Sequence, residues 1–348
     1  MCAKRASGKC SVTGDSLLGV PADPDDFRPT ASWDALRRRA ELLRQVRAFF
    51  ERRGFLEVET PVLSADTVVD RHLDPFASGV PSEPGRPPRR LWLQTSPELH
   101  MKRLLAAGAE RIYQIARVFR LGERGSLHNP EFTLVEWYRV GDGLDEGMAL
   151  LAELCEAILG RGSAERISYR EAFLRHAEVD PIQSGIDELA AAAARWGVVA
   201  PESLRRDEED RDDWLDLILA QRVQPRLGVE RPAIVYDYPA SQAALARLKP
   251  GDPRLAERFE LYVSGVELAN GYHELTDAGE LRRRWAEVNR RRAADGKPTL
   301  PERNRLLRAM EAGLPDGVGV ALGFDRLVML AIGAERIDQV IAFPFARA

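Results

Sequence analysis

Residues 117–140 read RVFRLGERGSLHNPEFTLVEWYRV, and this stretch decides the predicted fold. Residues 112–120 and 131–140 are strand-like, and the polar segment between them contains Gly122 and Gly125. The pattern predicts an antiparallel hairpin with a long loop. Because strand side chains alternate between faces, one face of the second strand should carry Phe132, Leu134, Glu136 and Tyr138.

The same hairpin carries the first sign of chemistry. A carboxylate beside a phenol on an apolar face is costly to bury unless both meet a partner, which makes Glu136 and Tyr138 candidate binding residues. Arg120 ends the first strand, and the charged, glycine-rich loop after it could close over an anion. An internal ion pair between Glu136 and Arg120 is the alternative that needs no ligand.

Upstream of the hairpin, the sequence predicts a helix and a strand, followed by a second strand and helix. Apolar residues recur at helical spacing over 33–50, and residues 55–60 follow as a strand that a proline stops. A strand over 91–95 runs into Ser96-Pro97-Glu98, residue types that favour a helix start. We therefore expect a helix over 97–107.

Downstream of the hairpin, helices predominate before strands return. Strands are expected at 233–236, 258–263, 266–269 and 318–322, and a last helix at 324–332. Hairpins with helices set between them are typical of α+β domains, so we expect a mostly antiparallel sheet flanked by helices over residues 31–348. Residues 1–30 are rich in Gly, Ser, Pro and Asp without a hydrophobic period, which predicts a disordered leader.

A second candidate site lies in the acidic segment 258–277. A turn at Ser264-Gly265 would join two strands and bring Glu260 and Glu267 across from each other. Like charges side by side on a sheet repel, and paired carboxylates suit Mg²⁺ held together with substrate phosphates. Solvated charges on an exposed strand are the alternative interpretation.

The third candidate is GVALGFDR at 319–326, where a strand leads into an apolar helix. Arg326 falls in the first turn of that helix, where the helix dipole disfavours a cation. An anion held between Arg326 and the free N–H groups would resolve this conflict. Simple screening of Arg326 by Asp325 is the alternative.

Composition limits the classes of function. The 348 residues are 45% apolar and 30% charged with a net charge of −4, which is typical of a globular protein. No stretch reaches the ~18–20 apolar residues of a membrane span and the N-terminus has no secretory signal, so no membrane partner is expected. Three cysteines fit no disulfide or metal framework, which favours a cytoplasmic location. The absence of a basic tail disfavours nucleic acid as the main partner.

Several well-known motifs are absent from the sequence. There is no G-x-x-x-x-G-K-[ST] and no G-x-G-x-x-G after a strand, which excludes Walker-type ATPases and Rossmann dinucleotide enzymes. The five histidines lack metal-binding spacing. The expected chemistry therefore rests on the three segments above.

Taken together, these segments resemble the signature motifs of class II aminoacyl-tRNA synthetases. FLEVETPVL at 55–63, with the helix before it, is similar to motif 1, which builds the family's dimer interface, so the resemblance implies a homodimer. RVFR…HNPEFTLVEWY at 117–138 is similar to motif 2, and GVALGFDRLVML at 319–330 to motif 3. TSPELHMKRLL at 95–105 and ELANGYHELTD at 267–277 resemble the sequence patterns of the lysyl-tRNA synthetase branch.

The resemblance implies a role for individual residues. Arg120 and Arg326 would be catalytic, on the α- and γ-phosphates of ATP, and Phe132 would stack on adenine with Arg326 on its other face. Glu260 and Glu267 would hold Mg²⁺. The other ATP-binding residues would be Leu121, Gly122, Glu123, Asn129, Leu268 and Gly323, with Glu267 shared. The amino-acid substrate would be bound by Ser96, Pro97, Glu98, Glu136, Tyr138, Asn270, Glu274 and Ala321.

The implied substrate is an amino acid that bears ammonium groups, because carboxylates without a competing buried cation suit such a ligand. One position departs from the family pattern. Gly122 stands where motif 2 usually has an acidic residue, so either Glu123 takes over its contact or one nucleotide contact is lost.

Two features resemble one branch more than the rest. A lysyl-tRNA synthetase places an anticodon-binding OB domain before this core, whereas a short leader precedes motif 1 here, and Ala321 stands where the synthetase usually has glycine. Both features are similar to the elongation factor P–(R)-β-lysine ligases. That resemblance implies that ATP activates (R)-β-lysine as its adenylate, which is then transferred to a lysine side chain of elongation factor P.

Two other functions stay open at this point. A truncated lysyl-tRNA synthetase would charge tRNA, although the lack of an OB domain and the unremarkable charge make tRNA an unlikely partner. A non-catalytic, amino-acid-sensing paralogue should tolerate loss of ATP-site residues, yet Arg120, Glu260, Glu267 and Arg326 are all present.

Overall fold

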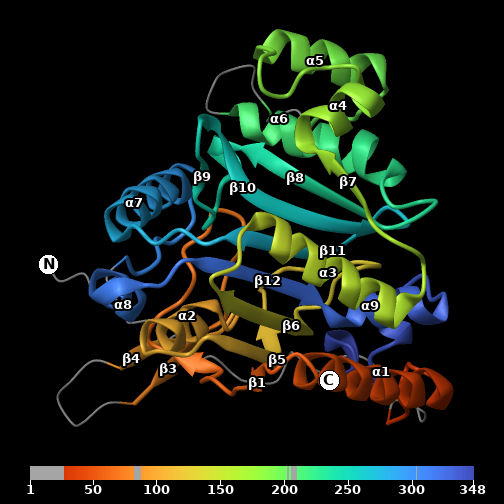
Figure 1. Cartoon of the computed structure of the whole chain (residues 1–348), viewed down its shortest axis with the longest axis vertical. Coiled ribbons are helices and arrows are strands. Elements are labelled where there is room, and N and C mark those ends of the chain that lie inside the picture. The colour runs from red at the N-terminus through yellow and green to blue at the C-terminus, as the bar shows by residue number, and fades with distance from the viewer. Residues whose placement is uncertain (1–26, 82–87, 202–203, 205–209, 303) are drawn as a thin grey trace, which may run out of the picture.

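A large, mostly antiparallel sheet crosses the computed structural model, which describes residues 27–81, 88–201, 204, 210–302 and 304–348 (Figure 1). The strand order is β1-β5-β6-β12-β11-β10-β8-β7, and β9 pairs with β10. The strands are β1 (Leu56–Glu57), β5 (Arg111–Phe119), β6 (Glu131–Val140), β7 (Glu165–Ser168), β8 (Ala233–Pro239), β9 (Leu248–Lys249), β10 (Asp252–Val263), β11 (Val266–His273) and β12 (Gly317–Gly323). The expected α+β architecture is confirmed.

The predicted hairpin forms as β5 and β6, which pair antiparallel from Arg111↔Arg139 to Phe119↔Glu131. The strand expected at 55–60 is shorter than predicted. β1 pairs in parallel with β5 over Leu56–Glu57. Pro61, which has no N–H to donate, follows soon after.

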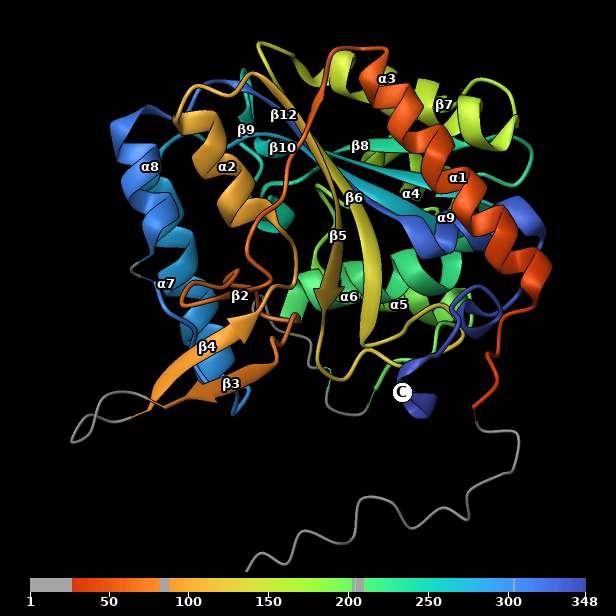
Figure 2. The ribbon, with the colours of Figure 1, turned by 90° about the horizontal axis from the view of Figure 1, so that it is seen from below.

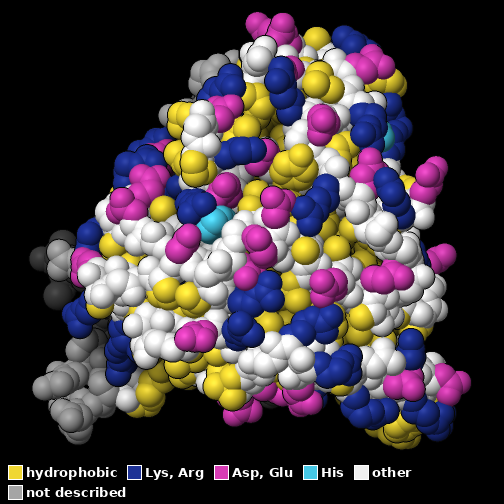
Figure 3. Space-filling view, viewed as in Figure 1, with side chains coloured by type: hydrophobic (Ala, Val, Ile, Leu, Met, Phe, Trp, Pro, Cys, Tyr) yellow, Lys and Arg dark blue, Asp and Glu magenta, His cyan; other side chains and the backbone are white. Residues whose placement is uncertain are grey.

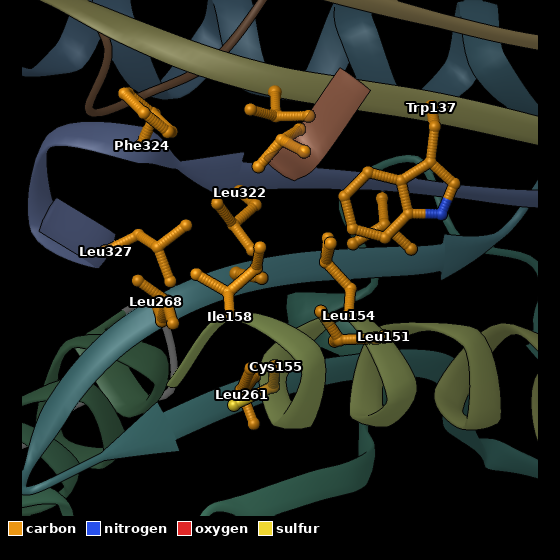
Figure 4. Packing of buried hydrophobic residues seen from close by; sticks show 14 of the residues in the cluster. Trp137, Leu151, Leu154, Cys155, Ile158, Leu261, Leu268, Leu322, Phe324 and Leu327 are labelled. Carbon is orange, nitrogen blue, oxygen red and sulfur yellow. The ribbon is translucent and has the colours of Figure 1, made fainter. Parts of the chain in front are cut away.

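Three helices cover one face of the sheet: α1 (Trp33–Glu51), α3 (Leu144–Leu159) and α9 (Phe324–Ile332). Their apolar sides meet alternate residues of the central strands. Figure 4 shows Leu151, Leu154 and Ile158 of α3 packed near Trp137 and Leu322, and Cys155 of the same helix beside Leu261. The sheet residues between these core positions point to the opposite face, which leaves that face available for a site.

Two groups of helices flank this opposite face (Figures 1 and 2). One group, near β5 and β6, comprises α2 (Glu98–Ala106), α7 (Ala278–Ala294) and α8 (Arg305–Gly313). The other group, near β7 and β8, comprises α4 (Tyr169–Ala177), α5 (Ile186–Arg195) and α6 (Arg211–Ile218), which a π-helical turn, Leu219–Val223, extends. A cleft lined by α6, α7 and the open sheet face lies between the groups.

A small second sheet, in the order β2-β4-β3, projects beside α2 and α8 (Figure 2). It contains β2 (Leu63–Ser64), β3 (Ala77–Val80) and β4 (Arg89–Leu93). Residues 65–75 leave this sheet as a strap, and residues 68–73 of the strap form one wall of the cleft.

The predicted leader lies almost wholly outside the described residues, which begin at Phe27. Thr30 donates its backbone N–H to the carbonyl of Ala342 at 2.9 Å, so the first described residues are bound to the C-terminal segment. Acidic and basic side chains are intermixed over the face in Figure 3. None of the described helices combines the length and apolar composition that a bilayer crossing requires.

Candidate active site

A row of side chains crosses the open face of the sheet. The strand ladders place Glu136 opposite Gln114 and Ala321, and Asn270 opposite Ala321 and Glu260. Directly opposed residues share a face of the sheet. Five strands therefore contribute one residue each to this cross-strand row, which contains four of the residues predicted for the site.

A β-bulge then sets the position of Glu267. The turn at Ser264-Gly265 forms as predicted, with positive φ angles of 51° and 75°, and pairs Tyr262 with Glu267. One extra residue on β11 shifts the register, so Glu260 lies opposite Asn270. The prediction that Glu260 and Glu267 lie directly across from each other is wrong, because Glu267 pairs with Tyr262. Glu260 lies two residues from Tyr262 on β10, so the two carboxylates are diagonal neighbours. Desolvation in the cleft and then the charge of Glu260 raise the pKa of Glu267.

Three buried carboxylates gather at one end of the cleft: Glu98, Glu136 and Glu274. Glu136 accepts hydrogen bonds from the hydroxyls of Ser96 at 2.8 Å and Tyr138 at 2.7 Å. Burial, with repulsion from Glu98, raises the pKa of Glu136 to about 8. Burial likewise raises the pKa of Glu274 to about 7. These hydroxyls, and not the guanidinium of an arginine, are the partners of Glu136, so the predicted alternative of a Glu136–Arg120 pair is wrong.

The expectation that no buried cation competes with these carboxylates is also wrong. Lys102 follows Glu98 by one turn of α2 and is only 2% exposed. Its Nζ lies 2.6 Å from Oε1 of Glu98 and 2.5 Å from Oε2 of Glu274. The negative charge of this carboxylate cluster is therefore partly neutralised by Lys102.

Arg120 and Phe132 meet at the other end of the cleft. The guanidinium carbon of Arg120 is 5.0 Å from the ring centroid of Phe132. Gly122 adopts a φ of +85°, a left-handed conformation that glycine tolerates, and the loop turns so that Glu123 lies 3.5 Å from Arg120. Glu123 thus reaches the cleft, although Gly122 occupies the position where motif 2 usually has an acidic residue.

Arg326 lies in the first turn of α9, as predicted. Its guanidinium donates to the carbonyl of Glu267 at 2.8 Å and contacts Nε2 of His128 at 2.7 Å. Because a guanidinium can only donate, Nε2 of His128 is the acceptor of this contact, and burial with the charge of Arg326 lowers the pKa of His128, which favours the neutral imidazole. Arg326 therefore faces the cleft from a fixed position.

The sequence left open the alternative that Asp325 screens the charge of Arg326. In the structure, Asp325 does not do so. Its carboxylate lies 2.5 Å from the guanidinium of Arg39 on α1 and accepts a hydrogen bond from the backbone N–H of Thr133 at 2.7 Å. Arg39 also donates to the hydroxyl of Thr133 at 2.9 Å. This cluster joins α1, β6 and α9 behind the cleft.

The other predicted nucleotide contacts offer mainly backbone. The side chain of Asn129 donates to the carbonyl of Glu131 at 2.6 Å and accepts from the N–H of Phe345 at 3.0 Å, so its amide holds the loop. Leu268 is 2% exposed, and its side chain packs in the core (Figure 4). Leu268 and Gly323 can therefore offer only backbone groups to a ligand.

Glu260 and Glu267 carry the carboxylates predicted to bind Mg²⁺, and their surroundings differ. Glu260 accepts hydrogen bonds from Arg258 at 2.5 Å and Tyr238 at 2.6 Å, and also from Tyr262, whereas the side chain of Glu267 is 41% exposed towards the cleft. Among the described residues, no group of three acidic, His or Cys side chains could hold a metal alone. This donor set fits Mg²⁺, which keeps waters and phosphate oxygens and needs only one or two carboxylates.

The cleft has a volume of about 880 Å³ and brings together most of the predicted site residues. Those that line it are Ser96, Glu98, Arg120, Glu123, Asn129, Phe132, Glu136, Tyr138, Glu267, Leu268, Asn270, Glu274, Ala321, Gly323 and Arg326. Four other predicted residues are not among its lining: Pro97, Leu121, Gly122 and Glu260. Glu260 lies behind Arg258 instead, which does line the cleft.

Sequence reasoning missed several residues. Gly319 lies opposite both Tyr138 and Tyr272, and a Cβ there would come within 2.3 Å of Glu274 Oε1. The spacing of Glu98 and Lys102, four residues apart on a helix, was a readable signal for their ion pair. The position of the strap at the cleft wall could not be predicted from nearby residues. The strap is held by Arg292, which is distant in sequence and donates to the carbonyl of Asp70 at 2.8 Å.

Comparison with known proteins identifies the family. Residues 26–347 match the family model described as tRNA synthetases class II (D, K and N). The chain belongs to this family. In this class II synthetase, the segments predicted as motifs 1, 2 and 3 are α1 with β1, β5 with β6, and β12 with α9.

Among curated relatives, this class II synthetase chain is 48% identical to the elongation factor P–(R)-β-lysine ligase of Edwardsiella ictaluri, over 94% of this chain and 100% of the relative. It is 48% identical to the enzyme of that name from Vibrio cholerae, over 93% and 99% of the two chains. The corresponding protein of Proteus mirabilis is 47% identical, over 93% and 98%. Within the class II synthetases, the chain therefore belongs to the family of these ligases.

Proposed function

We propose that this protein uses ATP to activate (R)-β-lysine as an acyl-adenylate and transfers it to a lysine side chain of elongation factor P. The observation that carries the proposal is the two-ended cleft. Guanidinium groups and an aromatic ring stand at one end, and buried carboxylates stand at the other. The names of the relatives supply the identity of the amino acid and the acceptor.

The carboxylate end favours an amino acid with more than one ammonium group. Glu136 holds only hydroxyl donors, so its charge is available to a ligand. One oxygen each of Glu98 and Glu274 contacts Lys102, which leaves each with a second oxygen for the substrate. Asn270 adds a buried Oδ1 that has no hydrogen-bond partner among the described residues and that suits an N–H donor.

The nucleotide end favours an ATP whose adenine stacks on Phe132 and whose phosphates meet Arg120 and Arg326. In the first step, a carboxylate oxygen of the amino acid attacks the α-phosphorus, and pyrophosphate leaves. Arg120 would stabilise the negative charge that grows on the α-phosphate, while Arg326 would neutralise the leaving group. Positioning and charge neutralisation then account for most of the catalysis.

Enzymes of the class II synthetase type use ATP with Mg²⁺. Glu267 would hold the ion directly, and Glu260 would add a second negative charge behind it. The ion would screen the phosphate charges when bound. Arg258 contacts Glu260 at 2.5 Å and holds that carboxylate in place.

In the second step, the neutral Nζ of the acceptor lysine attacks the adenylate carbonyl. A C–N bond forms, the bond to the phosphate oxygen breaks, and AMP leaves together with a proton. The neutral His128 lies at the Arg326 end of the cleft, away from the buried carboxylates. We therefore assign no side chain as the base for this step.

The decisive experiment is intact-mass analysis of elongation factor P after incubation with this protein, ATP, Mg²⁺ and (R)-β-lysine. We expect a gain of one lysyl residue, with less product from α-lysine. Pyrophosphate exchange that depends on the amino acid tests the first step by itself. Exchange without any modification of elongation factor P would refute the acceptor and retain the adenylation.

Two alternatives have distinct outcomes in the same assays. Labelled amino acid that ends on tRNA would favour a tRNA-charging enzyme, and ATP binding without turnover would favour a sensor. A homodimer remains part of the proposal. It is supported by exposed apolar side chains on α1, β1 and β2, namely Trp33, Leu56 and Leu63. A cytoplasmic location follows from the proposed acceptor and is tested by fractionation.

A further inference from the structure

Lys102 is a buried ammonium that the proposed reaction does not use. It projects from α2 between Glu98 on its own helix and Glu274 at the end of β11. Both carboxylates line the cleft, whereas Lys102 is not among the lining residues. Each carboxylate therefore faces Lys102 with one oxygen and the cleft with the rest of its surface.

The charge of Lys102 is secured by its surroundings. An ammonium without a partner would lose its proton on burial. Here the attraction of Glu274 and Glu98 outweighs the desolvation and raises the pKa of Lys102. The other titratable groups at this end are Glu136, Tyr138 and Tyr272, and the pKa of each is raised by burial. The two carboxylate contacts, at 2.6 and 2.5 Å, thus favour the charged form of Lys102.

This charge changes the electrostatic balance of the site. Glu98, Glu136 and Glu274 contribute three negative charges when ionised and Lys102 contributes one positive charge, which leaves a net charge of −2. Two substrate ammonium groups would neutralise that charge completely. A substrate with one ammonium would leave a buried carboxylate without a partner, which is costly.

We propose that Lys102 is a positioning residue that determines substrate specificity, because it neutralises one of three carboxylates and orients two of them for an amino acid with two ammonium groups. The inference rests on the proposed function, since it assumes that this end of the cleft holds the amino acid. The new element is that the charge of Lys102 determines how many ammonium groups of the substrate the three carboxylates can pair with.

The test compares three variants with the unaltered protein in pyrophosphate exchange. Lys102→Met keeps the length of the side chain and removes its charge. We expect the KM for (R)-β-lysine to rise at least about tenfold while the KM for ATP stays within about twofold, because breaking a buried charge pair is strongly unfavourable. The pH above which the KM for the amino acid reaches its low plateau should also move upward, since three carboxylates without Lys102 hold their protons more tightly.

The double variant Glu98→Gln/Lys102→Met restores the charge balance to −2 without the ion pair. It should regain most of the affinity for the amino acid and the original pH profile. Lys249→Met is the matched control, because it removes a lysine that pairs with Asp237 on β8, outside the cleft lining. This control should leave both KM values and the pH profile unchanged.

An unchanged KM for the amino acid in a folded Lys102→Met variant would overturn the inference. If Lys102→Met does not fold, the double variant decides: an affinity still reduced tenfold, with a displaced pH profile, would equally overturn it. A purely structural role would lower kcat and the affinity for ATP alongside that for the amino acid. Failure of the unaltered protein to exchange pyrophosphate with any diamino acid would instead refute the proposed function itself.

Discussion

The guanidinium of Arg39 on α1 lies 2.5 Å from the carboxylate of Asp325, the residue directly before Arg326 on α9. Both side chains are largely buried, at 12% and 2% exposure. Asp325 also accepts the backbone N–H of Thr133, next to Phe132 on β6. Through Arg39 and Asp325, α1 therefore supports the backbone next to Phe132 and next to Arg326.

Replacement of Arg39 by Met should weaken this support. We expect a loss of about 3 kcal/mol in the free energy of unfolding, because a buried carboxylate loses its partner. The KM for ATP should rise more than the KM for the amino acid. Denaturant unfolding and pyrophosphate exchange measure these effects. Arg38→Met is the control, because Arg38 pairs with Glu41 on the exposed side of the same helix; equal effects of the two substitutions would contradict the prediction.

Gly319→Ala should block the amino-acid end of the cleft. A Cβ at this position would come within 2.2 Å of the Tyr138 ring and 2.3 Å of Glu274 Oε1, distances that force one of them to move. We expect binding of the amino acid to fall steeply, while ATP binding, measured by calorimetry, changes little. Gly79→Ala is the control, because a Cβ at Gly79 meets no atom of the described residues within 4 Å. Normal binding of the amino acid by Gly319→Ala would show that the substrate lies elsewhere.

Binding of the amino acid should depend on pH. Glu136 and Glu274, with pKa values of about 8 and about 7, hold protons in the free protein near neutral pH. An ammonium ligand favours the ionised carboxylates, so binding should release protons, and affinity should rise with pH until it levels off above about 8. Calorimetry in two buffers with different ionisation enthalpies measures this release. Identical binding enthalpies in both buffers would contradict the prediction, and Glu136→Gln should reduce the difference.

Glu136 and Glu274 should affect the free energy of unfolding in the opposite direction, so that stability falls as the pH rises. A carboxylate whose pKa is raised in the folded state binds protons more tightly there than in the unfolded chain. The ligand-free protein should therefore lose stability as the pH rises from about 4.5 towards 8 at Glu136. The amino acid should offset this loss most strongly at pH 8. Thermal unfolding at several pH values, with and without the amino acid, gives both trends, and a ligand effect independent of pH would contradict them.

Ala321→Gly should relax the choice between lysine isomers. The Ala321 methyl lies between Glu136 and Asn270 in the cross-strand row, where it narrows the space for the substrate. Removal of one methyl gives only modest discrimination, so we expect the preference for (R)-β-lysine over α-lysine to fall by less than about 100-fold. The ratio of kcat/KM for the two isomers measures this. A ratio that does not change would exclude Ala321 as a selectivity residue.

The fold was largely readable from local patterns. Alternation placed Phe132, Leu134, Glu136 and Tyr138 on one face, and the turn at Ser264-Gly265 formed as expected. These features depend on neighbouring residues, which a single sequence displays directly. The resemblance supplied the family, which the comparisons confirm.

The geometry of the site depended on features without a local signal. The turn at Ser264-Gly265 pairs Glu267 with Tyr262, and the bulge on β11 then moves the residue opposite Glu260 from Ala269 to Asn270, although nothing in the residue types announced the extra residue. Glu98 and Lys102 have the spacing of an ordinary surface pair, and the second partner of Lys102, Glu274, is far away in the sequence. The position of Asp325 was misjudged for the same reason. Its partner, Arg39, is 286 residues away.

The cross-strand row from Gln114 to Glu260 has a consequence for how the site can change. Each of its five residues comes from a different strand, and their immediate chain neighbours, such as Val135 and Leu322, are packed in the core. Insertion or deletion of one residue within any of these strands would exchange a side chain on the open face for a core side chain. New substrate preferences can therefore arise by replacement at fixed positions, while changes in length are confined to the loops.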